Sequence, residues 1–161
     1  MNSLNLIFGR LAKLTIGIAA TAIVGMAAVE VWQVFARYVM NDSPSWTEPV
    51  ALLLMSTAMM FGSAAGVRSN RHFGFFVLLD HVSAGARRAL LVIARGIATV
   101  VGLLLSLWGW RMLSESWDFP MAGASLPQGM VFVPVCLGGA LIALFALEQI
   151  ISPPPAAQPG E

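Results

Sequence analysis

Charged side chains are scarce in this sequence. Aspartate, glutamate, lysine and arginine make up only 11% of its 161 residues, whereas hydrophobic residues make up 58%. Ordinary globular chains carry roughly 25% charged residues, which cover the surface that faces water. A chain this poor in charge cannot cover such a surface, so we expect membrane lipids to surround much of it. The formal net charge of +1 argues against nucleic acid as a partner.

Cysteine and histidine are scarcer still. Cys136 lies alone within an apolar run, so it has no partner for an internal disulfide, and we interpret it as a packing residue. His72 and His81 both fall outside the long apolar runs, where neither could hold a haem between membrane helices. No zinc-ligand cluster, carboxylate pair or nucleophile–base pair appears. We therefore expect no cofactor, no metal site and no enzyme activity.

Four apolar segments are long enough to cross a bilayer as helices. A helix rises about 1.5 Å per residue, so a hydrocarbon core about 30 Å thick needs roughly 20 residues. Backbone polar groups must be paired in lipid, and the short alternating strands of a barrel are absent, so we expect an all-α membrane protein. The first run is too long for a signal peptide and is interpreted as a retained helix. The predicted spans are residues 14–36, 48–67, 89–112 and 128–150.

Basic residues are concentrated on one side of these spans. Seven of the nine precede the first span, or lie between the second and third spans or just inside the third. The positive-inside rule therefore places both termini in the cytoplasm. We interpret most of these residues, and His72 beside them, as determinants of topology and contacts for phospholipids. The seven are Arg10, Lys13, Arg68, Arg71, Arg87, Arg88 and Arg95.

The segment between the second and third spans has its own helical pattern. Phe75, Leu78, Leu79 and Val82 follow i, i+3, i+4, i+7 spacing, which predicts a short amphipathic helix over residues 73–84, ended by Gly85. It would lie in the membrane interface or pack on a partner's membrane-proximal surface. We expect residues 1–151 to form one membrane domain and the proline-rich residues 152–161 to form a disordered tail.

Glu30 lies well inside the first predicted span, where a carboxylate is costly unless it faces protein, water or a basic partner. Three interpretations are open. Glu30 forms a structural hydrogen bond or an ion pair with Arg37 or Arg111, it faces a partner subunit, or it couples transport to protons as in small multidrug exporters. In the second span, Gly62 and Gly66 form a GxxxG motif, which predicts close helix packing within the chain or against a partner.

Residues 37–48 form a polar break between the first two spans, and the chemistry of a helix start explains much of it. Thr47 is a candidate N-cap, Glu48 suits the positive end of the helix dipole, and Pro49 is tolerated in the first turn. Trp46 is expected at the membrane interface. Arg37 is a candidate ion-pair partner of Glu48 across the turn.

This break also carries a resemblance to a known family. The residues that carry it are Trp32–Gln33, the Phe-Ala-Arg-Tyr sequence ending at Tyr38, the Asn-Asp-Ser-Pro turn and the Trp-Thr-Glu sequence at residues 46–48. Together they resemble the small membrane subunit of tripartite ATP-independent periplasmic (TRAP) transporters, the DctQ family. The family often has a second acidic residue after Trp-Thr-Glu, where this chain has Pro49, so a role for that carboxylate is not carried over.

The resemblance implies a scaffold in the inner membrane of a bacterium or archaeon. Its partners would be a large DctM-like membrane subunit, which holds the substrate and sodium sites, and a periplasmic DctP-like binding protein. The transported substrate would be an organic acid. The hairpin residues Arg37, Tyr38, Trp46, Thr47 and Glu48 would then serve as a structural clasp or partner contact. Two alternatives remain open: a proton-coupled exporter that uses Glu30, and a membrane anchor of a redox complex.

Overall fold

The computed structural model describes residues 3–69 and 83–151, and within them the regular structure is helical apart from an isolated bridge between Pro120 and Pro127. Four helices are long and apolar enough to cross a membrane, which confirms the predicted number of spans. The elements are α1 (Ser3–Tyr38), α2 (Thr47–Arg68), α4 (Ala84–Glu115), the 3₁₀ helix η1 (Gln128–Phe132) and α5 (Val133–Ile151).

Two helices, α1 and α4, are longer than the apolar runs that predicted them, whereas α5 begins only at Val133, after the 3₁₀ helix η1 over residues 128–132. α1 begins at Ser3 rather than near residue 14, and α4 begins at Ala84 rather than near residue 89. Gly85, the predicted end of an amphipathic helix, instead lies in the first turn of α4, where the Ser83 hydroxyl accepts a hydrogen bond from the Ala86 N–H at 3.5 Å. The rest of that predicted helix, residues 73–82, and the predicted tail lie outside the described residues.

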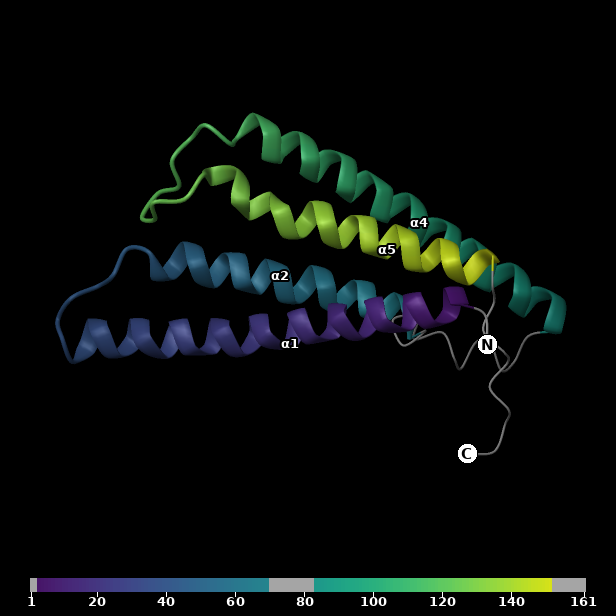
Figure 1. Ribbon diagram of the computed structural model, residues 1–161, viewed down its shortest axis with the longest axis horizontal. Helices are drawn as coiled ribbons and strands as arrows, with labels where there is room; N and C mark the ends of the chain where they lie inside the picture. The colour runs from purple at the N-terminus through teal and green to yellow at the C-terminus, as the bar shows by residue number, and fades with distance from the viewer. Residues whose placement is uncertain (1–2, 70–82, 152–161) are drawn as a thin grey trace.

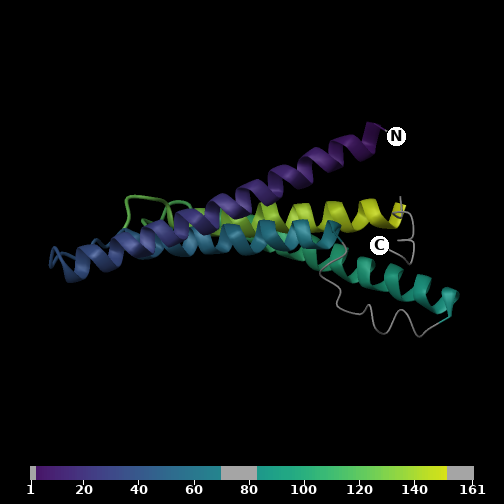
Figure 2. The ribbon, with the colours of Figure 1, turned by 90° about the horizontal axis from the view of Figure 1, so that it is seen from below.

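The four helices lie side by side in a row in the order α1, α2, α5, α4 (Figure 1). The row consists of two antiparallel hairpins, α1–α2 and α4–α5, which meet where α2 packs on α5. We call the end with residues 39–46 and 116–127 the loop end, and the opposite end, where α1 begins and α5 finishes, the terminal end. Toward the terminal end, the N-terminal half of α1 rises out of the plane of the row (Figure 2), although Phe8, Leu11 and Ala12 still pack against α2 and α5.

A small apolar core fills the space between α1, α2 and α5 near the terminal end. Phe145 of α5 and Ala64 of α2 are fully buried there, and Phe8 of α1 meets the Phe145 ring edge-on at a centroid distance of 6.5 Å. Most other large apolar side chains are exposed on the two faces of the row, as expected for helices that face lipid or other membrane subunits. The fold is therefore an open row with little interior of its own.

Close approach between α4 and α5 depends on glycine. A Cβ added to Gly102 would lie 2.6 Å from the Ala143 nitrogen, and one added to Gly139 would lie 2.7 Å from the Ser106 nitrogen. Small residues permit this approach and the packing that membrane helices rely on. Gly62, half of the GxxxG motif noted in the sequence, has nothing within 4 Å of an added Cβ. Its side of α2 does not pack closely within the described chain.

Candidate functional site

The turn after α1 lies at the loop end and reverses the chain. Asn41 adopts a left-handed conformation with φ 56°, which asparagine tolerates better than most residues. The Asp42 N–H donates to the Ala36 carbonyl at 3.1 Å, and the Val39 N–H donates to the Phe35 carbonyl at 2.8 Å. These bonds satisfy carbonyl groups that the end of a helix otherwise leaves unpaired.

Two predictions about this hairpin are wrong. Thr47 is not the N-cap of α2 but its first helical residue, and its buried hydroxyl donates to the Pro44 carbonyl at 2.8 Å. Arg37 does not pair with Glu48. Its guanidinium instead donates to the Ser43 hydroxyl at 3.4 Å, at the surface. The hydroxyl of Thr47 thus holds the turn, while Glu48 stays exposed in the first turn of α2, where a carboxylate suits the helix dipole.

The second loop at this end is joined to the first. The Ser45 hydroxyl donates to the Gly123 carbonyl at 3.0 Å. Gly123 has φ 84°, and an added Cβ would collide with the Ser45 carbonyl oxygen. Within the second loop, the Met121 N–H donates to the Leu126 carbonyl at 2.8 Å, and Met121 is buried. No pattern in the sequence predicts this contact between the loops, because it depends on the position of the two hairpins in space.

Aromatic side chains surround the loop end. Tyr38 is 79% exposed, and Trp46, Trp117 and Phe119 are also exposed there. Indole and phenol rings favour the membrane–water interface, because they combine an apolar ring with a polar group that needs a partner. These side chains mark the loop end as a membrane boundary or a surface for another protein.

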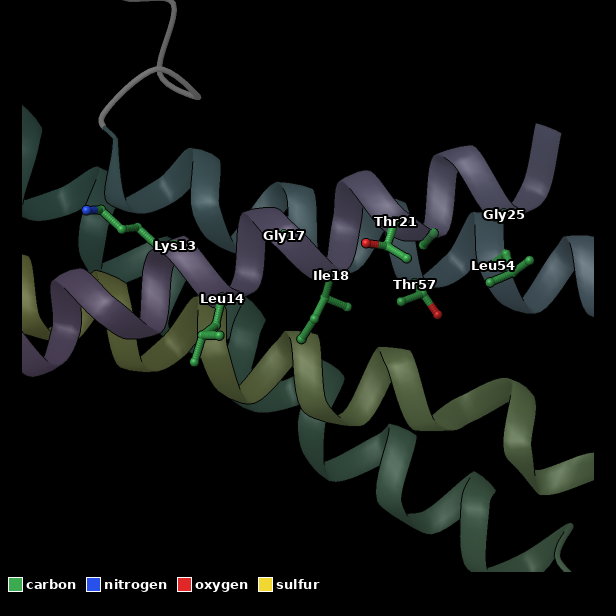
Figure 3. Close-up of a pocket in the computed structure, with 9 residues that line it drawn as sticks. Lys13, Leu14, Gly17, Ile18, Thr21, Gly25, Leu54 and Thr57 are labelled. Carbon is green, nitrogen blue, oxygen red and sulfur yellow. The ribbon is translucent and has the colours of Figure 1, made fainter. Parts of the chain in front are cut away.

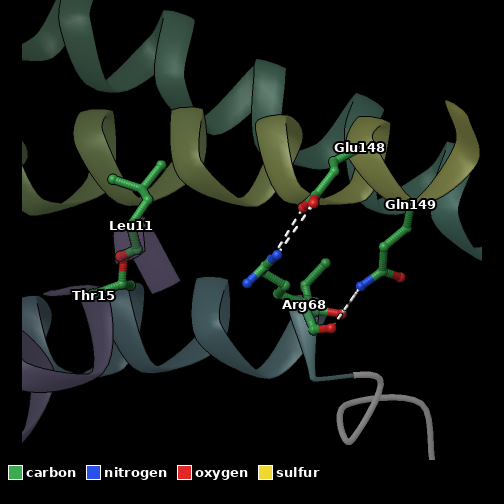
Figure 4. Close-up of polar contacts among 6 residues, drawn as sticks. Leu11, Thr15, Arg68, Glu148 and Gln149 are labelled. Atoms are coloured by element: carbon green, nitrogen blue, oxygen red, sulfur yellow. Dashed lines mark hydrogen bonds and ion pairs between the residues drawn. The ribbon is translucent and has the colours of Figure 1, made fainter. Parts of the chain in front are cut away.

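The terminal end carries the main ionic contact among the described residues. Arg68, the last residue of α2, forms a bidentate pair with Glu148 of α5, with Nε–Oε2 at 3.0 Å and Nη2–Oε1 at 3.2 Å (Figure 4). The two side chains are only 23% and 10% exposed. The guanidinium also lies 5.8 Å from the centroid of the Phe145 ring. The pair holds the ends of α2 and α5 together.

Two neighbouring side chains extend this contact to α4. The Gln149 amide of α5 donates to the carbonyls of Val67 and Arg68, each at 2.8 Å, and so satisfies the end of α2 (Figure 4). Arg95 of α4, which is buried, donates to the Gln149 carbonyl at 2.8 Å. We call Arg68, Glu148, Gln149 and Arg95 the polar clamp. It joins three of the four helices at the terminal end.

The sequence pointed to single members of the polar clamp but not to the clamp itself. The sequence predicts Arg68 and Arg95 as topology determinants, and no motif in it includes Gln149. The available signal was that Arg68 and Glu148 both end spans on the same side of the membrane. Their pairing also requires α2 to lie beside α5, which no pattern in the sequence specified.

Glu30 lies toward the loop end of α1 rather than at the middle of the membrane span. A Cβ added to Gly25 of α1 would lie 3.4 Å from the Leu54 side chain of α2, so the two residues are at the same level. Glu30 follows five residues later, about 7.5 Å nearer the loop end, at the level of the first turn of α2. Its side chain is exposed, and the described residues show no ion pair between it and Arg37 or Arg111. Arg111 pairs with Glu115 at 2.8 Å instead. The negative charge of Glu30 is therefore not neutralised by an ion pair within the described residues.

The remaining predicted site residues have less surrounding structure. Arg87 and Arg88 are exposed in the first turns of α4, at the terminal end. Gly66 lies in the last turn of α2, close to Arg68. Arg71 and His72 lie outside the described residues. The predicted site residues thus divide between the two ends, and the structure does not bring them together in one cluster.

Comparison with known proteins identifies the family. Residues 26–153 match the family model described as tripartite ATP-independent periplasmic transporters, DctQ component. The chain is also similar to the sialic acid TRAP transporter small permease protein SiaQ of Vibrio cholerae serotype O1 (strain ATCC 39315 / El Tor Inaba N16961). The two share 23% identity over 128 residues, which cover 79% of this chain and 73% of that protein. The chain therefore belongs to the DctQ family of small permease subunits of TRAP transporters, and is a transport component rather than an enzyme.

Proposed function

We propose that this chain is a scaffold subunit that supports a large DctM-like permease subunit in sodium-coupled, binding-protein-dependent uptake of an organic acid. The observation that carries the proposal is the open row of helices. α1 packs on α2, α2 on α5 and α5 on α4, so the row has two broad apolar faces. Such apolar faces suit packing against other membrane helices, and within the described residues they do not form a transport pathway for a polar substrate.

The polar side chains within the spans support the same interpretation. Thr15, Thr57 and Thr99 donate their hydroxyls to carbonyls one turn earlier in their own helices, at 2.7–2.8 Å. Arg68 and Glu148 pair with each other. Among the described residues these groups are used for folding, which leaves substrate and sodium sites to the large subunit. We accordingly propose no cofactor for this chain.

The partners and the substrate follow from the family and the relative. A tripartite transporter implies a large membrane subunit and a periplasmic DctP-like binding protein. The name of the Vibrio cholerae relative makes sialic acid the first candidate substrate. The basic residues Arg10, Lys13, Arg68, Arg87 and Arg88 all lie at the terminal end, which by the positive-inside rule supports a cytoplasmic location for that end. The loop end would then face the periplasm and the binding protein.

Family membership weighs against the two alternatives from the sequence. A self-contained exporter would need Glu30 on a transport pathway, yet Glu30 lies exposed at the level of the first turn of α2. A redox anchor has no support from the family. The exposed carboxylate is better explained by contact with a partner subunit or with the membrane interface.

Reconstitution in liposomes tests the proposal. We expect radiolabelled sialic acid, or another organic acid if sialic acid is inactive, to accumulate only when the small chain, the large subunit, the binding protein and an inward sodium gradient are all present. Liposomes with the small chain alone are the decisive control. Uptake by those liposomes would refute the scaffold role, and full activity of the large subunit without the small chain would refute the need for support.

A further inference from the structure

A groove of about 570 Å³ runs along the surface between α1 and α2 (Figure 3). Its walls are mostly apolar, with Leu14 and Ile18 on one side of α1 and Leu54 on α2 (Figure 3). The hydroxyl of Thr57, which also lines it, is already bonded to the Leu53 carbonyl at 2.7 Å. The groove is completed by Lys13, Gly17, Thr21, Ala22 and Gly25.

The groove is about as long as one leaflet of a bilayer is thick. From Lys13 to Gly25 the helix rises about 18 Å, and half of a hydrocarbon core of about 30 Å is about 15 Å. Lys13 marks the terminal end of the groove, since the preceding residues Leu11 and Ala12 pack against the apolar core at that end, which includes Val67 of the last turn of α2. The groove therefore extends from the membrane surface at the terminal end to about the middle of the bilayer.

The charge at the mouth of the groove is positive. Lys13 is exposed and lines the groove, and Arg10, one turn earlier on α1, is also exposed. A basic side chain near the membrane surface attracts an anionic lipid headgroup with about 1 kcal/mol. An apolar channel of leaflet length with an ammonium group at the surface matches a phospholipid, whose acyl chain and phosphate are separated in the same way.

We propose that this groove binds one anionic phospholipid of the leaflet at the terminal end. One acyl chain lies along Leu14, Ile18 and Leu54, and the phosphate group meets the ammonium group of Lys13. Gly17 forms part of the floor, and nothing lies within 4 Å of a Cβ added there, so the chain can approach the helix backbone. The lipid would fill the space between α1 and α2.

The α1 side of the proposed lipid site lies outside the residues that match the family model. The α1 residues that line the groove, Lys13 to Gly25, precede residue 26, where the family match begins. A helix of another membrane subunit is the competing occupant. The lysine at the surface end favours the lipid, because an apolar helix passing through the bilayer would gain nothing from a cation there.

Native mass spectrometry of the full-length chain, released from detergent with the subunits it retains, tests the charge. Phosphatidylglycerol and phosphatidylcholine are the probes. We expect phosphatidylglycerol to bind more tightly, and Lys13→Gln to weaken its binding about fivefold, the equivalent of about 1 kcal/mol. Arg88→Gln is the matched control, since it removes one exposed cation at the same end of the molecule but on α4, outside the groove, and it should change binding less than twofold. Equal binding of both lipids, or equal effects of both substitutions, would overturn the proposal.

The acyl-chain position is tested by filling the groove. Gly17→Leu adds a side chain into the open space of the groove, so the protein should still fold but should lose lipid binding. Gly96→Leu, at an equally open position on α4, is the control and should leave lipid binding unchanged. Phosphatidylglycerol with a diazirine in one acyl chain should label residues 14–25 of the parent protein in membranes and not those of the Gly17→Leu variant. Crosslinks from a photoreactive group at Ile18 to a large subunit, with no lipid labelling, would assign the groove to a protein helix and refute the proposal.

Discussion

Replacing Glu148 with glutamine should destabilise the fold, because it leaves the Arg68 guanidinium partly buried without its carboxylate. Removing one partner of a fully buried pair costs about 3–5 kcal/mol, whereas an exposed pair contributes about 0–1 kcal/mol. Arg68 and Glu148 are 23% and 10% exposed, which places this pair between those limits. The Phe145 ring, whose centroid lies 5.8 Å from the Arg68 guanidinium, would still stabilise part of that positive charge. We expect the free energy of unfolding to fall by about 2 kcal/mol.

A double-mutant cycle separates the pair from its surroundings. The variants are Arg68→Gln, Glu148→Gln and the double substitution, each unfolded with increasing SDS in mixed micelles and followed by circular dichroism. Because the bidentate contact exists only when both charges are present, we expect a coupling energy of at least about 1 kcal/mol. The double variant should then be more stable than the sum of the single effects predicts.

The exposed pair Arg111–Glu115 supplies the matched control. It has a similar Nε–O distance, 2.8 Å, but its side chains are 68% and 52% exposed. The same cycle on that pair should show no measurable coupling, because water competes for both charges. Additive effects of the Arg68 and Glu148 substitutions, within about 0.3–0.5 kcal/mol, would refute the argument that the polar clamp holds α2 to α5.

Four further substitutions, one of them a control, test the packing and the loop end. Gly102→Ala should lower the free energy of unfolding by about 1–3 kcal/mol in the same SDS assay, because its Cβ meets the α5 backbone. Gly62→Ala, the control, should leave the free energy of unfolding unchanged. Equal effects of the two substitutions would contradict the packing of α4 on α5. Gly123→Ala should free the second loop, seen as faster proteolysis between α4 and α5, because φ 84° and the neighbouring carbonyl both disfavour a side chain. Arg37→Ala should leave unfolding unchanged but weaken copurification with the large subunit, and unaltered copurification would count against a partner contact there.

The sequence predicted the number of membrane helices because span length and hydropathy are local properties. It also placed the hairpin between the first two spans correctly. It did not predict the spatial order of the helices, since the four apolar runs are too similar in composition to reveal which of them are neighbours. The contact between Arg68 and Glu148 follows from that order, as does the contact between Ser45 and Gly123. Both pairs are separated by about 80 residues in the chain.

Two local sequence rules, one for the N-cap and one for glycine spacing, did not lead to the contacts found in the structure. A threonine before an apolar run is typical of an N-cap, yet the Thr47 hydroxyl is taken by the Pro44 carbonyl. The GxxxG spacing drew attention to Gly62, although the closest backbone approaches involve Gly102 and Gly139. A spacing shows that two glycines share one helix face, but it does not show which face meets another helix.

The distribution of paired and exposed charges suggests different roles for the two ends of the molecule. At the terminal end, Arg68 and Glu148 are largely buried and satisfy each other. At the loop end, Glu30, Arg37 and Glu48 are exposed and form no ion pair within the described residues. A charge that stabilises a fold must be held by that fold, so substitutions of Arg68 or Glu148 should act on stability. Substitutions of the exposed charges Glu30, Arg37 and Glu48 should act on assembly and transport while the isolated chain remains folded.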